Sequence, residues 1–281
     1  MKSPVYREYE NKMVAVSNQF CYFLFADSEV ESHLSNSLNG IDDSAFVGDI
    51  FPKNLYSTRI HVKASTLPEY RRESFNTLAG VSLMASVEYL LSFVESIQDF
   101  RALVLPSQQF IKNKKLKKED QLHQNLRIWS NDDPEKNLIA TIRYLRLRRN
   151  HFAHQREENG SELTALLKNH SKELNKFWGK RKTKINDFDF REENMSEFND
   201  KQAIALLNLS WVCIKLVDEA ILKSMTKRDI ANYEISKFLK MGNTGSLTNQ
   251  KVASKFNGYL NRKYGSRFQY SVSEMELARK A

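Results

Sequence analysis

Apolar residues recur at steps of three or four along several stretches of the chain, which is the spacing of one face of an α-helix. One stretch runs from Glu73 to about Ala102, and Pro106 follows it and disfavours further helix. Another runs from Lys201 to about Met225. We predict a long amphipathic helix in each stretch. The apolar stripe of the first comprises Leu78, Val81, Met84, Val87, Leu91, Val94 and Ile97.

A third helix is predicted to begin near Glu135, because residues 131–134 (NDDP) combine helix-capping side chains with a proline suited to a first turn. Its stripe comprises Leu138, Ile142, Leu145, Arg149 and Phe152. An arginine thus stands where the pattern demands an apolar residue, and a buried guanidinium needs acceptors because it cannot lose its proton. Either the stripe turns toward a cleft or an interface at Arg149, or Arg149 pairs with a carboxylate such as Glu88.

The first 70 residues show no sustained period, so we expect an irregular N-terminal region over 1–70. Residues from Ser57 to Val62 alternate between polar and apolar types and are compatible with a short hairpin. The run from Met13 to Ala26 is apolar, but it falls short of the ~20 apolar residues that a spanning helix needs. We interpret that run as core and expect no membrane segment.

Two weaker helical patterns, Asp229 to Met241 and Asn249 to Tyr264, lie in the last part of the chain. This part is basic and aromatic, so we predict a basic C-terminal helical extension over 226–281 that either packs on the rest or contacts RNA. Before it, a helix is expected from Ser161, as its cap, to about Trp178, followed by a charged loop from Lys180 to Asp200.

Composition supports helices throughout. Gly (9) and Pro (5) are scarce, whereas β and α/β folds need many tight turns. A hydrophobic fraction of 41% and a charged fraction of 27% are typical of globular proteins. We therefore predict an all-α fold in which residues 71–225 form a helical bundle. The two cysteines lie far apart in apolar stretches, which indicates no disulfide framework and suits a reducing, cytoplasmic compartment.

The net charge favours a polyanionic partner. It is +9, with a sequence pI of about 9.3, and nucleic acid is the commonest large polyanion in a cell. The basic run at residues 111–119 (IKNKKLKKE) would strengthen such binding, although a solvated loop or helix face explains it equally well. A surface that is merely rich in lysine is the alternative. Charge alone indicates a partner and says nothing of a mechanism.

Most common enzyme motifs are missing from the sequence: it holds no Walker loop, GxGxxG, CxxC, HExxH or GxSxG. His151 and His154 are close neighbours, but without Cys or carboxylates at ligand spacing we expect no metal site. What remains is the run from Arg146 to His154 (RLRRNHFAH). Imidazole transfers protons near neutral pH, and guanidinium stabilises charge on phosphate. This set suits cleavage of RNA, whose own 2′-OH is the nucleophile, and not of DNA.

The string R-N-H-F-A-H at residues 149–154 resembles the Rx4-6H motif of HEPN-domain ribonucleases, in the form in which a polar residue follows the arginine. The segment 85–91 (ASVEYLL), which holds Glu88, resembles the early helix of that family that carries an acidic residue. The resemblance covers residues 71–225. It implies a helical bundle that forms a homodimer, in which the motifs of two protomers meet in one cleft, with no cofactor and no metal.

The resemblance also implies an activity. HEPN ribonucleases are metal-independent endoribonucleases that serve as toxins, as abortive-infection or antiviral effectors, or in RNA processing. RNA would be the substrate, and a toxin would be held inactive by an inhibitory partner protein, as in a toxin–antitoxin pair. We assign the motif to Arg149 with His154, although Arg146 with His151 and Arg148 with His154 also satisfy its spacing.

Each residue of the motif receives an expected role. His154 transfers the proton, and Arg149 binds the scissile phosphate from the same cleft or across to a partner chain. Asn150, four residues before His154, shares its helix face and positions the substrate, whereas residues five apart are separated by about 140°. Glu88 would orient Arg149, and His151 is a secondary candidate.

Three other interpretations stay open. Residues 149–154 could form a salt-bridged helix end in which Arg149 pairs with Glu88. The chain could be a catalytically inactive HEPN-like module that binds RNA or another protein. A DNA-binding regulator is a weaker third, because the helices from Asp229 to Tyr264 carry no recognisable helix-turn-helix signal.

Overall fold

The computed structural model describes residues 1–130, 136–154, 160–181, 185, 188–191, 195, 197–241, 245 and 247–280. Every regular element in these residues is a helix, and extended backbone is paired within them at a single bridge between Phe46 and Lys63. The prediction of an all-α fold is confirmed. The expected helix start at 131–134 lies outside the described residues.

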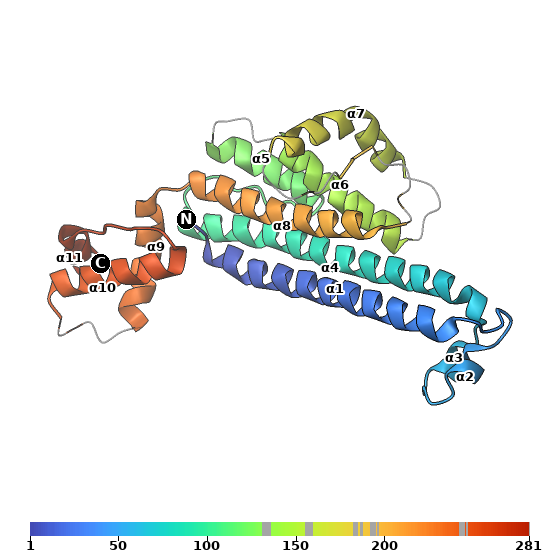
Figure 1. The fold of residues 1–281 in the computed structure, drawn as a ribbon. Coiled ribbons are helices and arrows are strands. Elements are labelled where there is room, and N and C mark those ends of the chain that lie inside the picture. Colours follow the sequence, from blue (N-terminus) through green and yellow to red (C-terminus); the bar gives the residue numbers. More distant parts are fainter. Residues whose placement is uncertain are drawn as a thin grey trace.

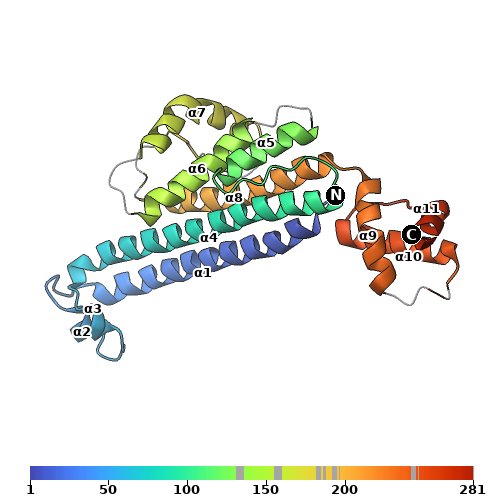
Figure 2. The same cartoon turned by 180° about the vertical axis from the view of Figure 1, so that it is seen from behind.

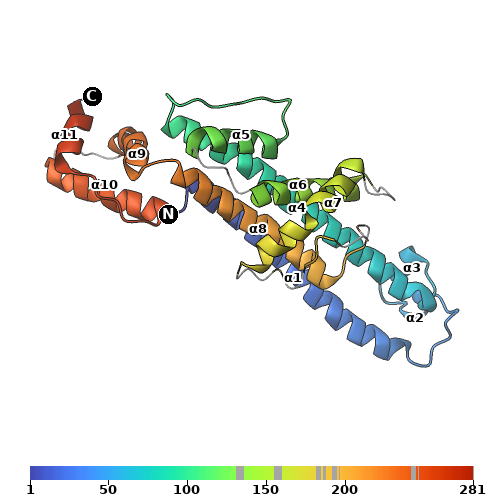
Figure 3. The same ribbon diagram turned by 90° about the horizontal axis from the view of Figure 1, so that it is seen from above.

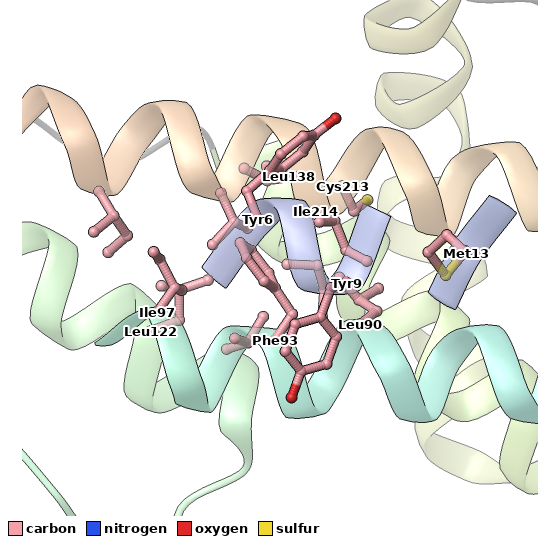
Figure 4. Close-up of a cluster of buried hydrophobic side chains, with 14 of the residues drawn as sticks. Tyr6, Tyr9, Met13, Leu90, Phe93, Ile97, Leu122, Leu138, Cys213 and Ile214 are labelled. Carbon is pink, nitrogen blue, oxygen red and sulfur yellow. The ribbon is translucent and has the colours of Figure 1, made fainter. Parts of the chain in front are cut away.

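Three long helices lie side by side: α1 (Pro4–Leu38), α4 (Leu67–Val104) and α8 (Asp200–Lys223) (Figure 1). Helix α4 packs against both of the others, and α1 also packs against α8. Figure 4 shows part of the shared core. The residues labelled there are Tyr6, Tyr9 and Met13 of α1, Leu90, Phe93 and Ile97 of α4, Leu122 of α5 (Lys118–Ser130), Leu138 of α6 (Lys136–Ala153), and Cys213 and Ile214 of α8.

The expectation of an irregular region over 1–70 is wrong, because α1 is a helix of 35 residues. The Ser3 side chain caps it by accepting a hydrogen bond from the Tyr6 backbone N–H, and Pro4 occupies its first turn. Its buried side packs on α4 and α8, so it belongs to the bundle and not to a separate region. The suggested hairpin is also wrong, since Ser57–Ile60 forms the short helix α3.

Helix α4 confirms the first predicted helix. Its predicted stripe is buried at Val87, Leu91, Val94 and Ile97 but is wrong in the N-terminal half of the helix. Leu78 and Val81, which the predicted stripe placed inside, are 40% and 51% exposed. The buried face of its N-terminal half instead includes Phe75, Ala79 and Leu83. Segment Ala64–Val104 is the one helix in the described part of the chain that is long and apolar enough to cross a membrane, and 50% of its most apolar stretch is buried inside the protein. Core helices of bundles have this composition too.

Helices α5 (Lys118–Ser130), α6 (Lys136–Ala153) and α7 (Ser161–Gly179) lie on the side of α4 away from α1 (Figure 2). Helices α6 and α7 confirm the predicted helices, although Gly160 and not Ser161 is the cap of α7. The described residues from Lys180 to Asn199 are non-helical, in agreement with the predicted loop. Several of them are buried against the bundle: Ile185, Phe190, Met195 and Phe198.

Helices α9 (Lys227–Met241), α10 (Asn249–Tyr264) and α11 (Val272–Lys280) form a C-terminal unit at one end of the long helices, next to the N-terminus (Figure 3). The backbone N–H of Lys2 donates to the Tyr264 carbonyl oxygen at 2.9 Å. The first two helices were predicted, and α11 was not. At the opposite end, α2 (Val47–Ile50), α3 and the 3-10 turn Ala64–Thr66 connect α1 to α4.

Candidate active site

The motif predicted from the sequence lies in the last turns of α6, and its residues divide between two faces of the helix. Arg146, Asn150 and His154 follow one another at steps of four and line a cavity of about 280 Å³. The cavity lies between the end of α6 and the first turn of α7. Lys117, which immediately precedes α5, also lines it. Asn150 and His154 therefore meet in one pocket.

His154 offers an accessible imidazole. Its backbone N–H donates to the Asn150 carbonyl oxygen at 3.1 Å, which continues the helical turn, and its side chain is exposed. His151 lines the same cavity but is buried, at 5% exposure. Between these two histidines, His154 has the access that proton transfer to a large substrate requires.

Arg146 forms a buried network behind the cavity. Its Nε donates to Glu119 Oε1 at 2.7 Å, and its Nη2 donates to Glu162 Oε1 at 2.8 Å. Glu119 is fully buried, whereas Glu162 is about half exposed. Burial opposes the charge of the guanidinium, but the two carboxylates reverse this effect and raise the pKa of Arg146 above its usual value. The side chain is thereby held in one orientation at the cavity.

Arg149 faces the other way. It lies one residue before Asn150, about 100° around the helix, and its Nη2 pairs with Glu88 Oε1 on α4. The predicted carboxylate partner is thus confirmed. Partial burial lowers the pKa of Arg149, but an arginine stays charged at physiological pH. Arg149 is not among the residues that line the cavity, so within one chain it does not meet His154 there.

A close contact between α4 and α6 sets the position of the motif. The Phe152 ring lies directly on Gly80 of α4, where a Cβ atom would overlap three ring carbons. Phe152 also meets Phe198 edge to face, with ring centroids 6.0 Å apart. Arg148, on the buried side of α6, lies with its guanidinium 5.0 Å from the centre of the Phe198 ring. Gly80 therefore allows the end of α6 to approach α4.

Three residues of the site were not singled out from the sequence: Lys117, Glu119 and Glu162. Two of them belong to the basic run at 111–119, for which the sequence left two interpretations open, a polyanion-binding run and a solvated loop or helix face. The signal was the acidic residue that ends this run, since Glu119 is the partner that a buried arginine such as Arg146 requires. Glu162 lies in the first turn of α7, where an acidic residue is common for a different reason, the helix dipole.

The arrangement can transfer a proton next to a bound anion. The first turn of α7 lines the cavity, and the Lys117 ammonium, which lines it too, can pair with an anionic oxygen. Among the described residues, no group of three or more His, Cys, Asp or Glu side chains is placed to hold a metal ion. Comparison of the chain with protein-family models, with curated proteins and with solved structures found no match.

Proposed function

We propose that this chain is a metal-independent endoribonuclease of the HEPN type, with His154 as its proton-transfer residue. The observation that carries the proposal is the exposed His154 imidazole in a polar cavity that also holds the Asn150 amide and the Lys117 ammonium. Imidazole, amide and ammonium together can move a proton, fix a sugar or base, and offset phosphate charge.

The reaction uses the substrate's own nucleophile. The 2′-oxygen of one ribose forms a bond to the adjacent phosphorus, while the bond from phosphorus to the 5′-oxygen of the next nucleotide breaks. His154 removes the proton from the 2′-OH, and the departing 5′-oxygen takes a proton from water. The products are a 2′,3′-cyclic phosphate and a 5′-hydroxyl end. DNA is not a substrate because it lacks the 2′-OH.

In the proposed enzyme, Arg149 acts at the His154 cavity of a second copy of the chain. Its pair with Glu88 lies at the edge of an outward face of α4 that also carries Val81, seven residues before Glu88, and Leu78. Both apolar side chains are well exposed, and large exposed apolar patches mark interaction sites. A homodimer that covers this face would bring Arg149 of one protomer toward the cavity of the other, as the resemblance to HEPN ribonucleases implies.

The proposed cellular role rests on the resemblance to HEPN ribonucleases. A metal-independent ribonuclease needs no cofactor and is harmful wherever RNA is accessible, so its activity has to be restrained. We place the protein in the cytoplasm as a toxin or an antiviral, abortive-infection effector. An inhibitory partner protein that covers the His154 cavity would supply the restraint.

The test is RNA cleavage by purified protein in EDTA. Wild type is expected to cleave total RNA, and His154→Ala to lose on the order of a hundredfold or more of the rate, which is the usual contribution of a proton-transfer group. His170→Ala, which removes an exposed histidine of α7 outside the cavity, is the matched control and is expected to cleave normally. Cleavage by folded His154→Ala at the wild-type rate would refute the proposal.

A catalytically inactive module that binds RNA or a protein is the second candidate. The observation that favours it is that carboxylates engage both Arg146 and Arg149, which reduces the charge that either guanidinium offers to phosphate. Growth separates the two candidates. An endoribonuclease arrests growth when wild type is expressed, whereas His154→Ala does not. A binding module gives the same growth with both chains.

A further inference from the structure

The positive charge of the protein is concentrated in its C-terminal unit. Residues 226–281 hold eleven Lys and Arg against four Asp and Glu, a net of +7 out of +9 for the whole chain. Helices α9, α10 and α11 carry this charge at one end of the molecule (Figure 3). A field of one sign over a small unit attracts polyanions to that end.

A cavity of about 420 Å³ lies within this unit, which we name the C-terminal basic cavity. Lys227 and Arg228, from the first turn of α9, line one part of it. Arg267, from the loop between α10 and α11, lines another. Glu274 of α11 contributes a carboxylate. Two separate segments thus bring three cationic side chains to one hollow.

The loop that carries Arg267 is held by specific hydrogen bonds. Asn261 of α10 accepts from the backbone N–H of Phe268 at 2.6 Å. Asn257 accepts from the backbone N–H of Tyr270 at 2.7 Å and donates to the Tyr270 carbonyl oxygen at 3.0 Å. The side chains of Phe268 and Tyr270 are buried, and the residues that alternate with them, Arg267 and Gln269, are exposed to solvent. These hydrogen bonds hold the backbone on either side of Gln269, next to Arg267, in one conformation.

The cations in this cavity are only weakly neutralised. The Lys227 ammonium donates to the Arg267 carbonyl oxygen at 2.7 Å, which orients it without cancelling its charge. Arg228 Nε lies 3.4 Å from Glu274 Oε1, and the Arg228 side chain is 72% exposed. Glu274 also accepts hydrogen bonds from the backbone N–H and the hydroxyl of Ser271. These hydrogen bonds lower the pKa of Glu274 more than the charge of Arg228 does. Like charges that converge in this way repel one another, and a bound anion relieves the repulsion.

We propose that the C-terminal basic cavity binds a phosphate group of a single-stranded nucleic acid and holds the strand independently of cleavage at His154. A hollow that presents several cations suits one phosphate of a chain better than it suits a flat lipid surface. Because Phe268 and Tyr270 are buried, their rings are not available to stack on bases. Binding is therefore carried by the phosphate backbone, depends strongly on salt, and does not read sequence.

Fluorescence anisotropy with the full chain tests this site. The probes are labelled single-stranded oligo(dT), which cannot be cleaved through a 2′-OH, and oligo(U) with the His154→Ala chain. Arg228→Ala combined with Arg267→Ala is expected to weaken binding to both probes. It should also reduce the slope of log affinity against log salt by roughly 0.7, the value for the loss of one phosphate contact on a single strand. Lys53→Ala combined with Lys63→Ala, two exposed lysines at the α2–α3 end, is the charge-matched control.

Binding that falls in the Arg228/Arg267 variant, with a smaller salt slope, and stays at the wild-type level in the Lys53/Lys63 variant supports the site. An equal loss in both variants, or an unchanged salt slope, overturns it. Binding of wild type to vesicles of phosphatidylcholine and phosphatidylserine but not to either oligonucleotide also overturns it. Thermal unfolding of each variant confirms that the fold is retained. Because oligo(dT) is no ribonuclease substrate, these outcomes do not depend on whether the chain cleaves RNA.

Discussion

Replacing Gly80 by alanine tests the contact that holds the end of α6 on α4. In an open helix position, Gly→Ala stabilises a protein by about 1 kcal/mol. At Gly80 the new Cβ would overlap the Phe152 ring, which also packs edge to face against Phe198. Overpacking of this kind costs about 1–3 kcal/mol. The clash therefore outweighs the helix propensity, and we expect Gly80→Ala to lower the free energy of unfolding by about 1 kcal/mol.

Urea unfolding followed by circular dichroism measures this change, with two comparisons that isolate its cause. Gly258→Ala in α10, where an added Cβ meets nothing within 4 Å, should stabilise the protein by about 1 kcal/mol. In a Phe152→Ala background the clash is absent, so Gly80→Ala should become stabilising. If Gly80→Ala is stabilising beside an intact Phe152, the account of this contact is wrong. The same variant is expected to reduce RNA cleavage, because Phe152 lies between Arg149 and His154 on α6.

Three further predictions follow from particular side chains. Burial raises the pKa of Asp218 to about 6, so the fold favours the protonated carboxyl, and stability is lost as the pH rises from the unfolded value near 4 through 6. Urea unfolding should therefore show Asp218→Asn to be more stable than wild type by roughly 3 kcal/mol at neutral pH and about as stable as wild type near pH 4. A difference that stays constant across this pH range would contradict the raised pKa of Asp218. Glu119→Ala, which leaves Arg146 buried with Glu162 alone, should cost about 3 kcal/mol in the same assay, whereas Glu119→Leu with Arg146→Met should cost less than Glu119→Ala does. If Arg149 acts across a dimer, mixing inactive Arg149→Ala and His154→Ala chains should restore roughly a quarter of wild-type cleavage. Half of the dimers are then mixed, and each mixed dimer holds one complete site out of two. No restored activity would place both residues in one chain.

The sequence predicted the helices whose apolar stripes were longest and most regular, α4 and α8, together with α6. It failed at α1, although Ser3 and Pro4 form a cap and first-turn signature there. The second half of α1 projects past the start of α8 and leaves Tyr22 and Phe25 exposed, so its apolar residues follow no single stripe. Helix α11 was also not predicted, although Ser271 and Glu274 form a capping pattern at its start, as Ser3 and Pro4 do for α1.

Within the candidate site, local geometry was accessible from the sequence and distant partners were not. A spacing of four residues correctly placed Asn150 and His154 on one face of α6. The pairing of Arg146 with Glu119 joins residues 27 positions apart through the path of α5, which no local pattern specifies. The inward face of the N-terminal half of α4 was predicted wrongly for a related reason. That helix is apolar around most of its circumference, so a stripe can be drawn along more than one face.

The end chemistry of RNA cut by the wild-type protein in EDTA tests the central claim most directly. If the substrate's 2′-OH is the nucleophile and His154 moves the proton, the fragments carry 2′,3′-cyclic phosphates and 5′-hydroxyls. The His154→Ala protein, purified in the same way, leaves the RNA intact. Fragments with 5′-phosphates, or identical fragments from His154→Ala, would contradict the account.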